Sequence, residues 1–332
     1  MKANRIISGF VIAALAIGAG ACQQPYHQSD ERYVLVAVGI NDPYWQEAGA
    51  GLTDVGKNAG VKVELVGPAS FSPSDELASF QQAVAEHPSG IMVSVSDPKL
   101  FNEPIEGAIL QGIPVICIDA DAPDSSRVLF IGTDNFRAGQ KSGKRMAELL
   151  GGQGRVVLIA MGGQLNSEER IRGVNEALKD YPGIKIVQTI DDKGDVGAAN
   201  DSVFVLLQKK DKIDGIISLE ASGGEGAADA LHRLDLTGKI KIVAFDNNPQ
   251  TLDGIERGWI TATVVQKPYV MAFYGVRFLD DLHHNAVHEF KDWATAPAAP
   301  LPTFVDTGTA LVDASNLAAF RKALADHPKP NM

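Results

Sequence analysis

Polar side chains that can bond hydroxyl groups follow the apolar runs of this 332-residue sequence. Carboxylates and amides make in-plane hydrogen bonds to hydroxyls, and flat aromatic rings cover the apolar faces of a sugar ring. Four carboxylates against one arginine favour a neutral sugar or polyol over an anion. The candidate ligand contacts are Asp42, Tyr44, Trp45, Ser94, Asp119, Arg170, Glu220, Asp246 and Gln266.

Two of these candidates are large aromatic residues in the segment NDPYW, residues 41–45. Asp42-Pro43 is a turn pair, and turns lie at the surface, where exposed aromatic area is unfavourable. We therefore expect a bound sugar ring to cover Tyr44 and Trp45.

Helix capping is the competing interpretation of a polar residue that follows a strand. Asp119, Glu220 and Asp246 end very apolar runs, so we expect them to bind the ligand. Capping is the predicted role of Asp97, Asp134 and Asn247. The segment Gly223-Gly224-Glu225-Gly226 lacks the Lys-Ser/Thr pair of a phosphate-binding loop. We expect its glycines to let a helix begin close to the ligand.

Motifs of common hydrolases and metal sites are missing from the sequence. It has no G-x-S-x-G, H-E-x-x-H or C-x-x-C segment, so we expect neither catalysis nor a cofactor. His283, His284 and His288 follow Asp280 and Asp281, which favours a solvated helix face over a metal site. No metal is therefore predicted.

The first 21 residues have the pattern of a secretory signal peptide, because a basic segment precedes an apolar stretch that ends in small residues. Cys22 follows at the predicted cleavage site, as in a bacterial lipoprotein. Ordinary cleavage that leaves a free thiol is the alternative. Residues 22–32 are polar and would form a tether. We expect a monomer in the periplasm or at the cell surface of a bacterium, held by a lipid on Cys22.

Charge and cysteine content narrow the range of partners. The net charge of −11 becomes −13 once Lys2 and Arg5 are removed with the signal peptide (−11 − 2). An acidic chain without Lys/Arg blocks is not suited to nucleic acid or to an anionic membrane surface. Membrane contact is expected only through the lipid anchor. Cys117 lies in an apolar run and is expected to be an inert core thiol.

Strand-like and helix-like segments alternate from Tyr33 onward. The strand-like runs are short, rich in β-branched residues and not alternating, which is typical of parallel strands buried on both faces. Their number exceeds one small sheet, so we predict an α/β fold with two doubly wound parallel-sheet lobes joined by a three-segment hinge. The predicted strands are 33–39, 61–67, 90–96, 113–119, 128–133, 155–161, 184–190, 214–220, 240–246 and 260–266.

The predicted N-terminal lobe holds residues 33–134 and 267–303, and the C-terminal lobe holds residues 135–266 and 304–328. The helix that begins at Pro268 would pack on the N-terminal lobe. In open α/β sheets, ligands bind beyond the carboxyl ends of the strands. The candidate contacts would therefore converge in a cleft between the lobes.

Several segments, in this order, resemble the ribose-binding class of periplasmic solute-binding proteins, the type I "Venus flytrap" family. The likeness runs from Tyr33 to about Leu317 and rests on NDPYW, ICIDAD, SEERIRG, IVAFDNNP, ATVVQKP and FVDTGTALVDASNL. It implies that a sugar binds between two lobes that close by hinge bending. The aromatic pair would stack on the ring, and the other candidates would bond its hydroxyls.

Two departures from the pattern argue against ribose itself. Ala120 follows Asp119 where ribose binders commonly have Arg, and Glu220 stands where an amide is usual. Because the Tyr44-Trp45 pair offers more stacking surface than a Phe pair, a larger sugar, a polyol or an amino sugar is expected.

The resemblance implies the solute-binding component of an ABC importer, with the transporter permease as partner. Three other functions remain open from the sequence. The same binding could serve a chemoreceptor or sensor kinase, or Asp119 and Asp246 could be the carboxylate pair of a glycosidase. A repressor effector domain shares the fold, but the signal peptide argues against it.

Overall fold

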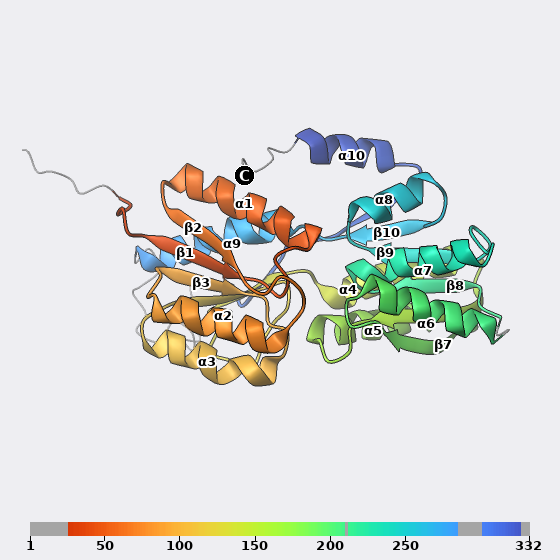
Figure 1. The fold of residues 1–332 in the computed structure, drawn as a ribbon, viewed down its shortest axis with the longest axis horizontal. Coiled ribbons are helices and arrows are strands. Elements are labelled where there is room, and N and C mark those ends of the chain that lie inside the picture. Colours follow the sequence, from red (N-terminus) through yellow and green to blue (C-terminus); the bar gives the residue numbers. More distant parts are fainter. Residues whose placement is uncertain (1–25, 210–211, 285–300, 327–332) are drawn as a thin grey trace, which may run out of the picture.

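The computed structural model describes residues 26–209, 212–284 and 301–326, which form two α/β lobes side by side (Figure 1). The predicted signal peptide, Cys22 and His288 lie outside these residues. Within the described ranges, no helix combines the length and the apolar character needed to span a membrane.

Each lobe contains one six-stranded sheet. The strand order is β11-β5-β4-β3-β1-β2 in the first lobe and β12-β10-β9-β8-β6-β7 in the second. All pairs are parallel except β10 with β12. The strands are β1 (Arg32–Val36), β2 (Lys62–Val66), β3 (Gly90–Val93), β4 (Val115–Ile118), β5 (Phe130–Gly132), β6 (Gln153–Ala160), β7 (Gly183–Asp191), β8 (Gly215–Ser218), β9 (Lys241–Phe245), β10 (Ala262–Val265), β11 (Phe304–Asp306) and β12 (Ala310–Asp313).

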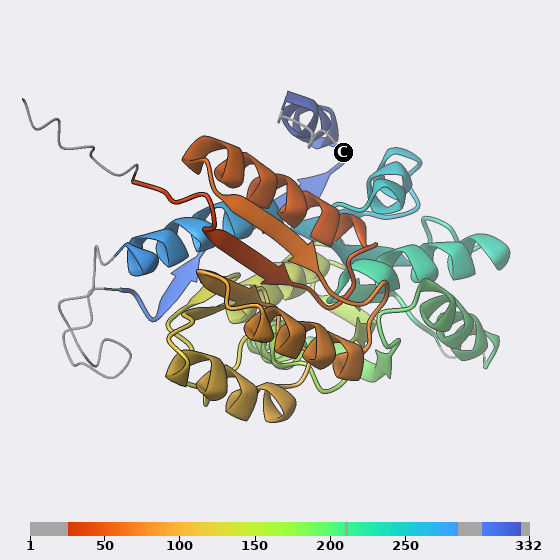
Figure 2. The same ribbon diagram turned by 60° about the vertical axis from the view of Figure 1, so that its left-hand side comes forward.

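Helices cover both faces of each sheet, which confirms the predicted pair of doubly wound lobes (Figure 2). The helices are α1 (Pro43–Ala59), α2 (Pro73–Ala85), α3 (Pro98–Leu110), α4 (Asn135–Leu149), α5 (Leu165–Leu178), α6 (Val196–Gln208), α7 (Ala221–Arg233), α8 (Pro249–Glu256), α9 (Pro268–His283) and α10 (Leu317–Asp326).

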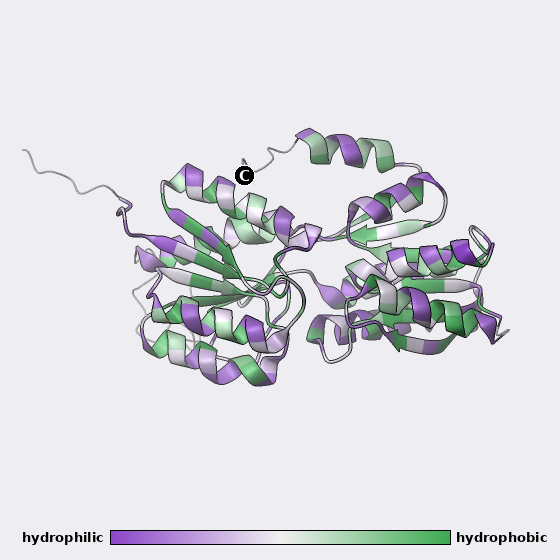
Figure 3. Cartoon of the chain, in the orientation of Figure 1, coloured by the Kyte–Doolittle hydropathy of each residue, from purple (hydrophilic) through white to green (hydrophobic). Residues whose placement is uncertain are grey.

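Both faces of the central strands are apolar, as the non-alternating runs predict (Figure 3). Successive side chains of a strand point to opposite faces. In β1, Tyr33 and Leu35 therefore join the core under α1 and α9, while Val34 and Val36 join the core under α2 and α3. The second lobe is built in the same way, with α4 and α5 on one face and α6, α7 and α8 on the other. Each sheet is therefore enclosed by helices on both faces.

Three chain segments join the lobes. The first runs from β5 to α4, and the second from β10 to α9, which packs against α1 of the first lobe. The predicted start of the final C-terminal segment at residue 304 is wrong, because β11 pairs in parallel with β5 of the first lobe. Phe304 stacks on Phe130, with ring centroids 5.3 Å apart. The third crossing therefore follows Asp306 and leads to β12, which pairs with β10.

The histidines near the end of α9 do not form one solvated face. His283 is exposed, as predicted. The side chain of His284 is only 14% exposed and forms ion pairs with Glu31 and Asp280, so the prediction of a solvated face is wrong for this residue. Glu31 and Arg32 belong to the predicted tether of residues 22–32, but Glu31 is 2% exposed and β1 begins at Arg32, so the tether prediction is wrong for this part. The contact of Glu31 with His284 depends on the tertiary fold, which the sequence did not reveal.

Candidate ligand-binding site

A cavity of about 240 Å³ lies between the lobes at the carboxyl ends of both sheets. All nine residues predicted to contact a ligand line it. Its volume lies just below the usual range of small-molecule sites, which begins at about 300 Å³. The first lobe contributes Asp42, Tyr44, Trp45, Ser94 and Asp119, and the second contributes Arg170, Glu220, Asp246 and Gln266.

Asp119 and Asp246 occupy equivalent positions in the two lobes. Asp119 directly follows β4 and Asp246 directly follows β9, with φ angles of 63° and 65°. This left-handed backbone region is unfavourable for residues other than glycine, although Asp tolerates it better than most. Strained residues of this kind cluster at binding and active sites. The backbone thus turns one carboxylate from each sheet into the cavity.

Burial dominates the electrostatics of both carboxylates. It raises the pKa of Asp119 and raises the pKa of Asp246 to about 7, while the nearby Arg170 guanidinium opposes both changes. Ser94 is fully buried beside Asp119 and favours its charged form. Donor groups of a bound ligand could supply further hydrogen bonds to these oxygens, which protein groups only partly satisfy.

Tyr44 and Trp45 are buried by the protein itself. They lie in the first turn of α1, pack edge to face at 5.1 Å, and are only 6% and 4% exposed. The expected exposed aromatic turn is therefore wrong, because both rings join the core under α1 and α9. Their remaining surface still lines the cavity. Tyr44 also donates a hydrogen bond from its hydroxyl to Asp119 Oδ1 (2.6 Å), so it positions that carboxylate.

The guanidinium of Arg170 is held on all sides by the second lobe. Its Nε donates to Asn135 Oδ1 (2.8 Å), Nη1 to the Leu219 carbonyl (2.7 Å) and Nη2 to Gln266 Oε1 (2.9 Å). The group also lies 4.5 Å from the centroid of the Phe245 ring. Three of its five N–H groups are thus committed to protein acceptors, which leaves two for a ligand.

Close packing of α4 against α5 sets the position of Arg170. A Cβ atom on Gly173 would lie 2.0 Å from the Phe136 carbonyl oxygen, and one on Gly139 would lie 2.0 Å from the Arg170 carbonyl oxygen. Real Cβ atoms do not approach so closely, and only glycine fits at either position. The spacing of Arg170 and Gly173 in SEERIRG therefore has a packing cause.

Gln266 connects the hinge to the cavity through its side-chain amide. Its Oε1 accepts from Thr133 Oγ1 (2.8 Å) as well as from Arg170, and its Nε2 donates to Asp246 Oδ1 (3.0 Å). Thr133 lies in the first crossing segment and Gln266 in the second. The predicted contact residue is thus also a structural link between two hinge segments.

Two carboxylates predicted to bind the ligand also cap helices. Asp42 accepts from the Tyr44 amide (2.8 Å), and Glu220 accepts from the amides of Ser222 (2.7 Å) and Gly223 (2.5 Å). Burial and the neighbouring carboxylate of Asp192 raise the pKa of Glu220. Both effects disfavour the charged form of Glu220 and so work against negative charge in the cavity.

The residues expected to be caps behave in two ways. Asp97 and Asp134 cap α3 and α4, as predicted. The capping prediction for Asn247 is wrong, because α8 begins after Asn248. The side chain of Asn247 instead donates to Glu47 Oε2 of α1 (2.9 Å), which links the two lobes.

Sequence reasoning missed several polar and apolar residues of the cavity wall. Some follow β6 in the segment GGQLNSEERIRG, residues 162–173, where position after a strand was an available signal. Phe71 comes from the loop after β2, and no sequence pattern marked it. The additional lining residues with large or polar side chains are Ser70, Phe71, Met161, Gln164, Asn166 and Ser222.

Comparison with known proteins shows which class of protein this chain resembles. The model of the periplasmic binding protein domain matches residues 33–285. The D-allose-binding periplasmic protein of Escherichia coli is 27% identical over 259 residues, which cover 75% of this chain and 83% of that protein. A solved arabinose-binding protein, AraP from Geobacillus stearothermophilus, is 33% identical with a TM-score of 0.76, covering 88% of this chain and 99% of that one. The sugar-binding protein of a sugar ABC transporter from Bacillus halodurans is 33% identical with a TM-score of 0.80, covering 87% and 100%.

Two lobes around a shared cavity define a two-lobed solute-binding protein. The chain belongs to the periplasmic binding protein family, within its ribose-binding-like, sugar-binding members. Its relatives are substrate-binding proteins, so it is not an enzyme and the glycosidase alternative is set aside. Membership also implies an extracytoplasmic location.

The raised pKa of Asp246 predicts a pH-dependent stability of the unliganded protein. The unfolded carboxyl ionises near pH 4, whereas the folded one does so near pH 7, so only the folded state holds this proton between those values. The contribution of Asp246 is full below about pH 4 and is lost as the pH rises toward 7 and beyond. Asp246→Asn should therefore gain stability relative to wild type with rising pH, measured by urea unfolding at pH 5 and 8. A constant difference between the two proteins would contradict the assignment.

Proposed function

We propose that this protein is the solute-binding component of an ABC importer and carries a neutral sugar or polyol between its two lobes. The observation that supports this best is the cavity itself, where buried carboxylates from both lobes surround one guanidinium. Arg170 is the only Lys or Arg among the described residues that line the cavity. Its Nε, Nη1 and Nη2 atoms each already donate a hydrogen bond to the protein. A phosphate or carboxylate ligand would meet several acidic groups and little free positive charge.

Hinge closure follows from where the contacts lie. A ligand favours the closed form only if it binds that form more tightly than the open one. Asp119 on the first lobe and Asp246 on the second can reach one ligand together only when the lobes are close. The link between Asn247 and Glu47 would add to closure, because it also joins the lobes.

The transporter permease is the proposed partner, since a closed, loaded lobe pair presents one defined surface to it. We also propose that Cys22 is acylated and anchors the chain beside that permease. Intact-mass measurement of the mature protein from its host should show an acylated N-terminal cysteine. An unmodified Cys22 would contradict the anchor and leave the binding function untouched.

A thermal-shift panel of neutral pentoses, hexoses, polyols, amino sugars and sugar phosphates tests the proposed function. A ligand at 100 times its dissociation constant should stabilise the fold by roughly 2.7 kcal/mol. We expect a raised melting temperature with a neutral sugar or polyol and none with a sugar phosphate.

A matched pair of variants then locates the site. Asp246→Asn should weaken binding of the active sugar by about 10- to 100-fold, since hydrogen bonds to a charged group contribute about 1.5–3 kcal/mol. Asp97→Asn should leave affinity unchanged, because Asp97 caps α3 away from the cavity lining and Asn caps about as well. Equal effects of the two substitutions, or a response to sugar phosphates alone, would refute the proposal.

A further inference from the structure

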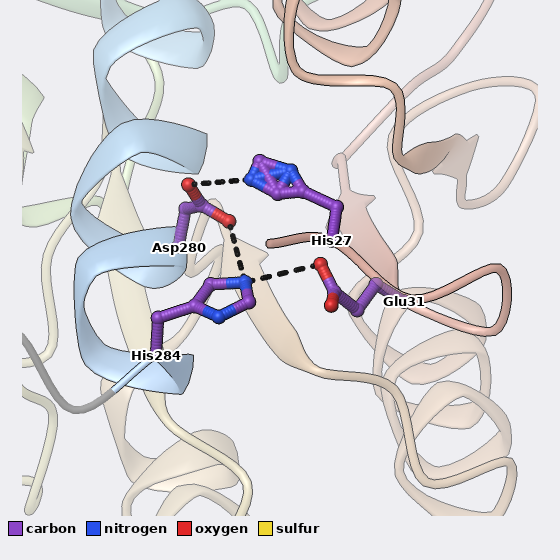
Figure 4. Close-up of side chains that lie close together, drawn as sticks. All are labelled: His27, Glu31, Asp280 and His284. Carbon is purple, nitrogen blue, oxygen red and sulfur yellow. Dashed lines mark hydrogen bonds and ion pairs between the residues drawn. The ribbon is translucent and has the colours of Figure 1, made fainter. Parts of the chain in front are cut away.

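Four side chains of metal-binding type meet where the segment before β1 crosses the end of α9 (Figure 4). His27 and Glu31 come from the segment, and Asp280 and His284 come from the last turn of α9 and the residue after it. One nitrogen or oxygen atom from each residue lies within 4.8 Å of the others. The cluster is on the far side of the first lobe from the sugar cavity and shares no residue with it.

Three nitrogen–oxygen separations in this cluster are close to the edge length of a tetrahedral coordination shell, with Asp280 facing each histidine through a different oxygen. His27 Nε2 lies 3.4 Å from Asp280 Oδ2, and His284 Nε2 lies 3.2 Å from Glu31 Oε2 and 3.5 Å from Asp280 Oδ1. Ligands at about 2.1 Å from a zinc ion in tetrahedral geometry are about 3.4 Å apart. Direct charged hydrogen bonds are shorter, at about 2.7–2.9 Å. The gaps are therefore close to the spacing expected around a shared metal, and the two contacts of Asp280 with histidine are longer than a direct charged hydrogen bond.

Outer contacts orient the ring of His27 for coordination. Its Nδ1 lies 2.8 Å from the carbonyl oxygen of Ala59, the last residue of α1, and a carbonyl can only accept. Nδ1 therefore carries a proton, which leaves Nε2 free to present a lone pair toward Asp280. That Nε2 is buried and makes no hydrogen bond within the described residues. Metal-bound histidines are held in this way, with the other ring nitrogen donating to a carbonyl or carboxylate.

The two carboxylates also need a cation. Glu31 is 2% exposed and Asp280 is 4% exposed, and buried charges are normally paired or bound to metals. Tyr33 donates from its hydroxyl to Asp280 Oδ1 (2.9 Å), and the Gln28 amide donates to Glu31 Oε1 (2.5 Å). These bonds fix both carboxylates in place. A surface hollow lined by Tyr26, His27 and Asp280 gives an ion access to the cluster.

We propose that His27, Glu31, Asp280 and His284 bind one divalent transition-metal ion, with Zn²⁺ the best match to two imidazoles and two carboxylates. Mg²⁺ and Ca²⁺ prefer all-oxygen shells of higher coordination number. The ion fastens the segment before β1 to α9.

Metal titration of the full chain tests this site. The protein is made with Cys22→Ser and without a polyhistidine tag, so that neither supplies a foreign ligand, and is stripped with a chelator. Calorimetry with zinc chloride should give one ion per chain, and Co²⁺ in place of zinc should give the intense visible absorption of tetrahedral cobalt. Zinc should also raise the melting temperature.

Histidine variants separate the proposed site from adventitious binding. His27→Gln and His284→Gln should each lower zinc affinity by at least about 10- to 100-fold, the loss typical of changes around a metal site. His283→Gln is the matched control, because His283 is exposed, adjacent in sequence and outside the cluster. Circular dichroism without zinc checks that all three variants fold.

Two results would overturn the proposal. One is the absence of stoichiometric zinc binding by the parent chain. The other is an equal loss of affinity in His283→Gln and in the two cluster variants.

Discussion

The side-chain amide of Gln266 holds the cleft together. Its oxygen accepts hydrogen bonds from Thr133 and Arg170, and its nitrogen donates to Asp246. No other neutral side chain of this length offers an acceptor to one side and a donor to the other. Glutamate would face the Asp246 carboxylate with a second negative charge, and leucine would leave three polar groups unpaired. The hinge and the Asp246 carboxylate therefore depend on the same side-chain amide, that of Gln266.

The cavity has an unfavourable conformational and electrostatic free energy. Asp119 and Asp246 have strained backbones, and burial disfavours their charged forms. Rigid surroundings maintain both features: the core under α1 and α9 holds Tyr44 against Asp119, and the glycine contacts of α4 and α5 hold Arg170 near Asp246. Hydrogen bonds from sugar hydroxyls would relieve part of this cost. Relief of this cost would then contribute to the affinity of the proposed ligand.

The sequence predicted the features that local pattern determines. Apolar runs located β1 to β10, and position at or after a strand end, together with the resemblance to the ribose-binding class, located the nine predicted contacts now found along the cavity. Features that depend on distant contacts were missed. β11 is a strand because Phe304 meets Phe130, Trp45 is buried because α9 packs on α1, and Asn247 bonds Glu47 of the other lobe. The cluster around His284 needs a segment more than 250 residues earlier in the chain. The spacing of residues along the sequence does not indicate these long-range contacts.

Small-angle X-ray scattering tests the central claim, that one ligand in the cavity holds both lobes. Profiles are recorded for the unliganded protein and for protein saturated with its active sugar. Because the carboxylates of the site are divided between lobes, the account predicts a smaller radius of gyration in the saturated sample. Asp246→Asn at the same sugar concentration should stay nearer to the unliganded profile. Identical profiles for wild-type protein with and without saturating sugar would contradict closure of the lobes on the ligand.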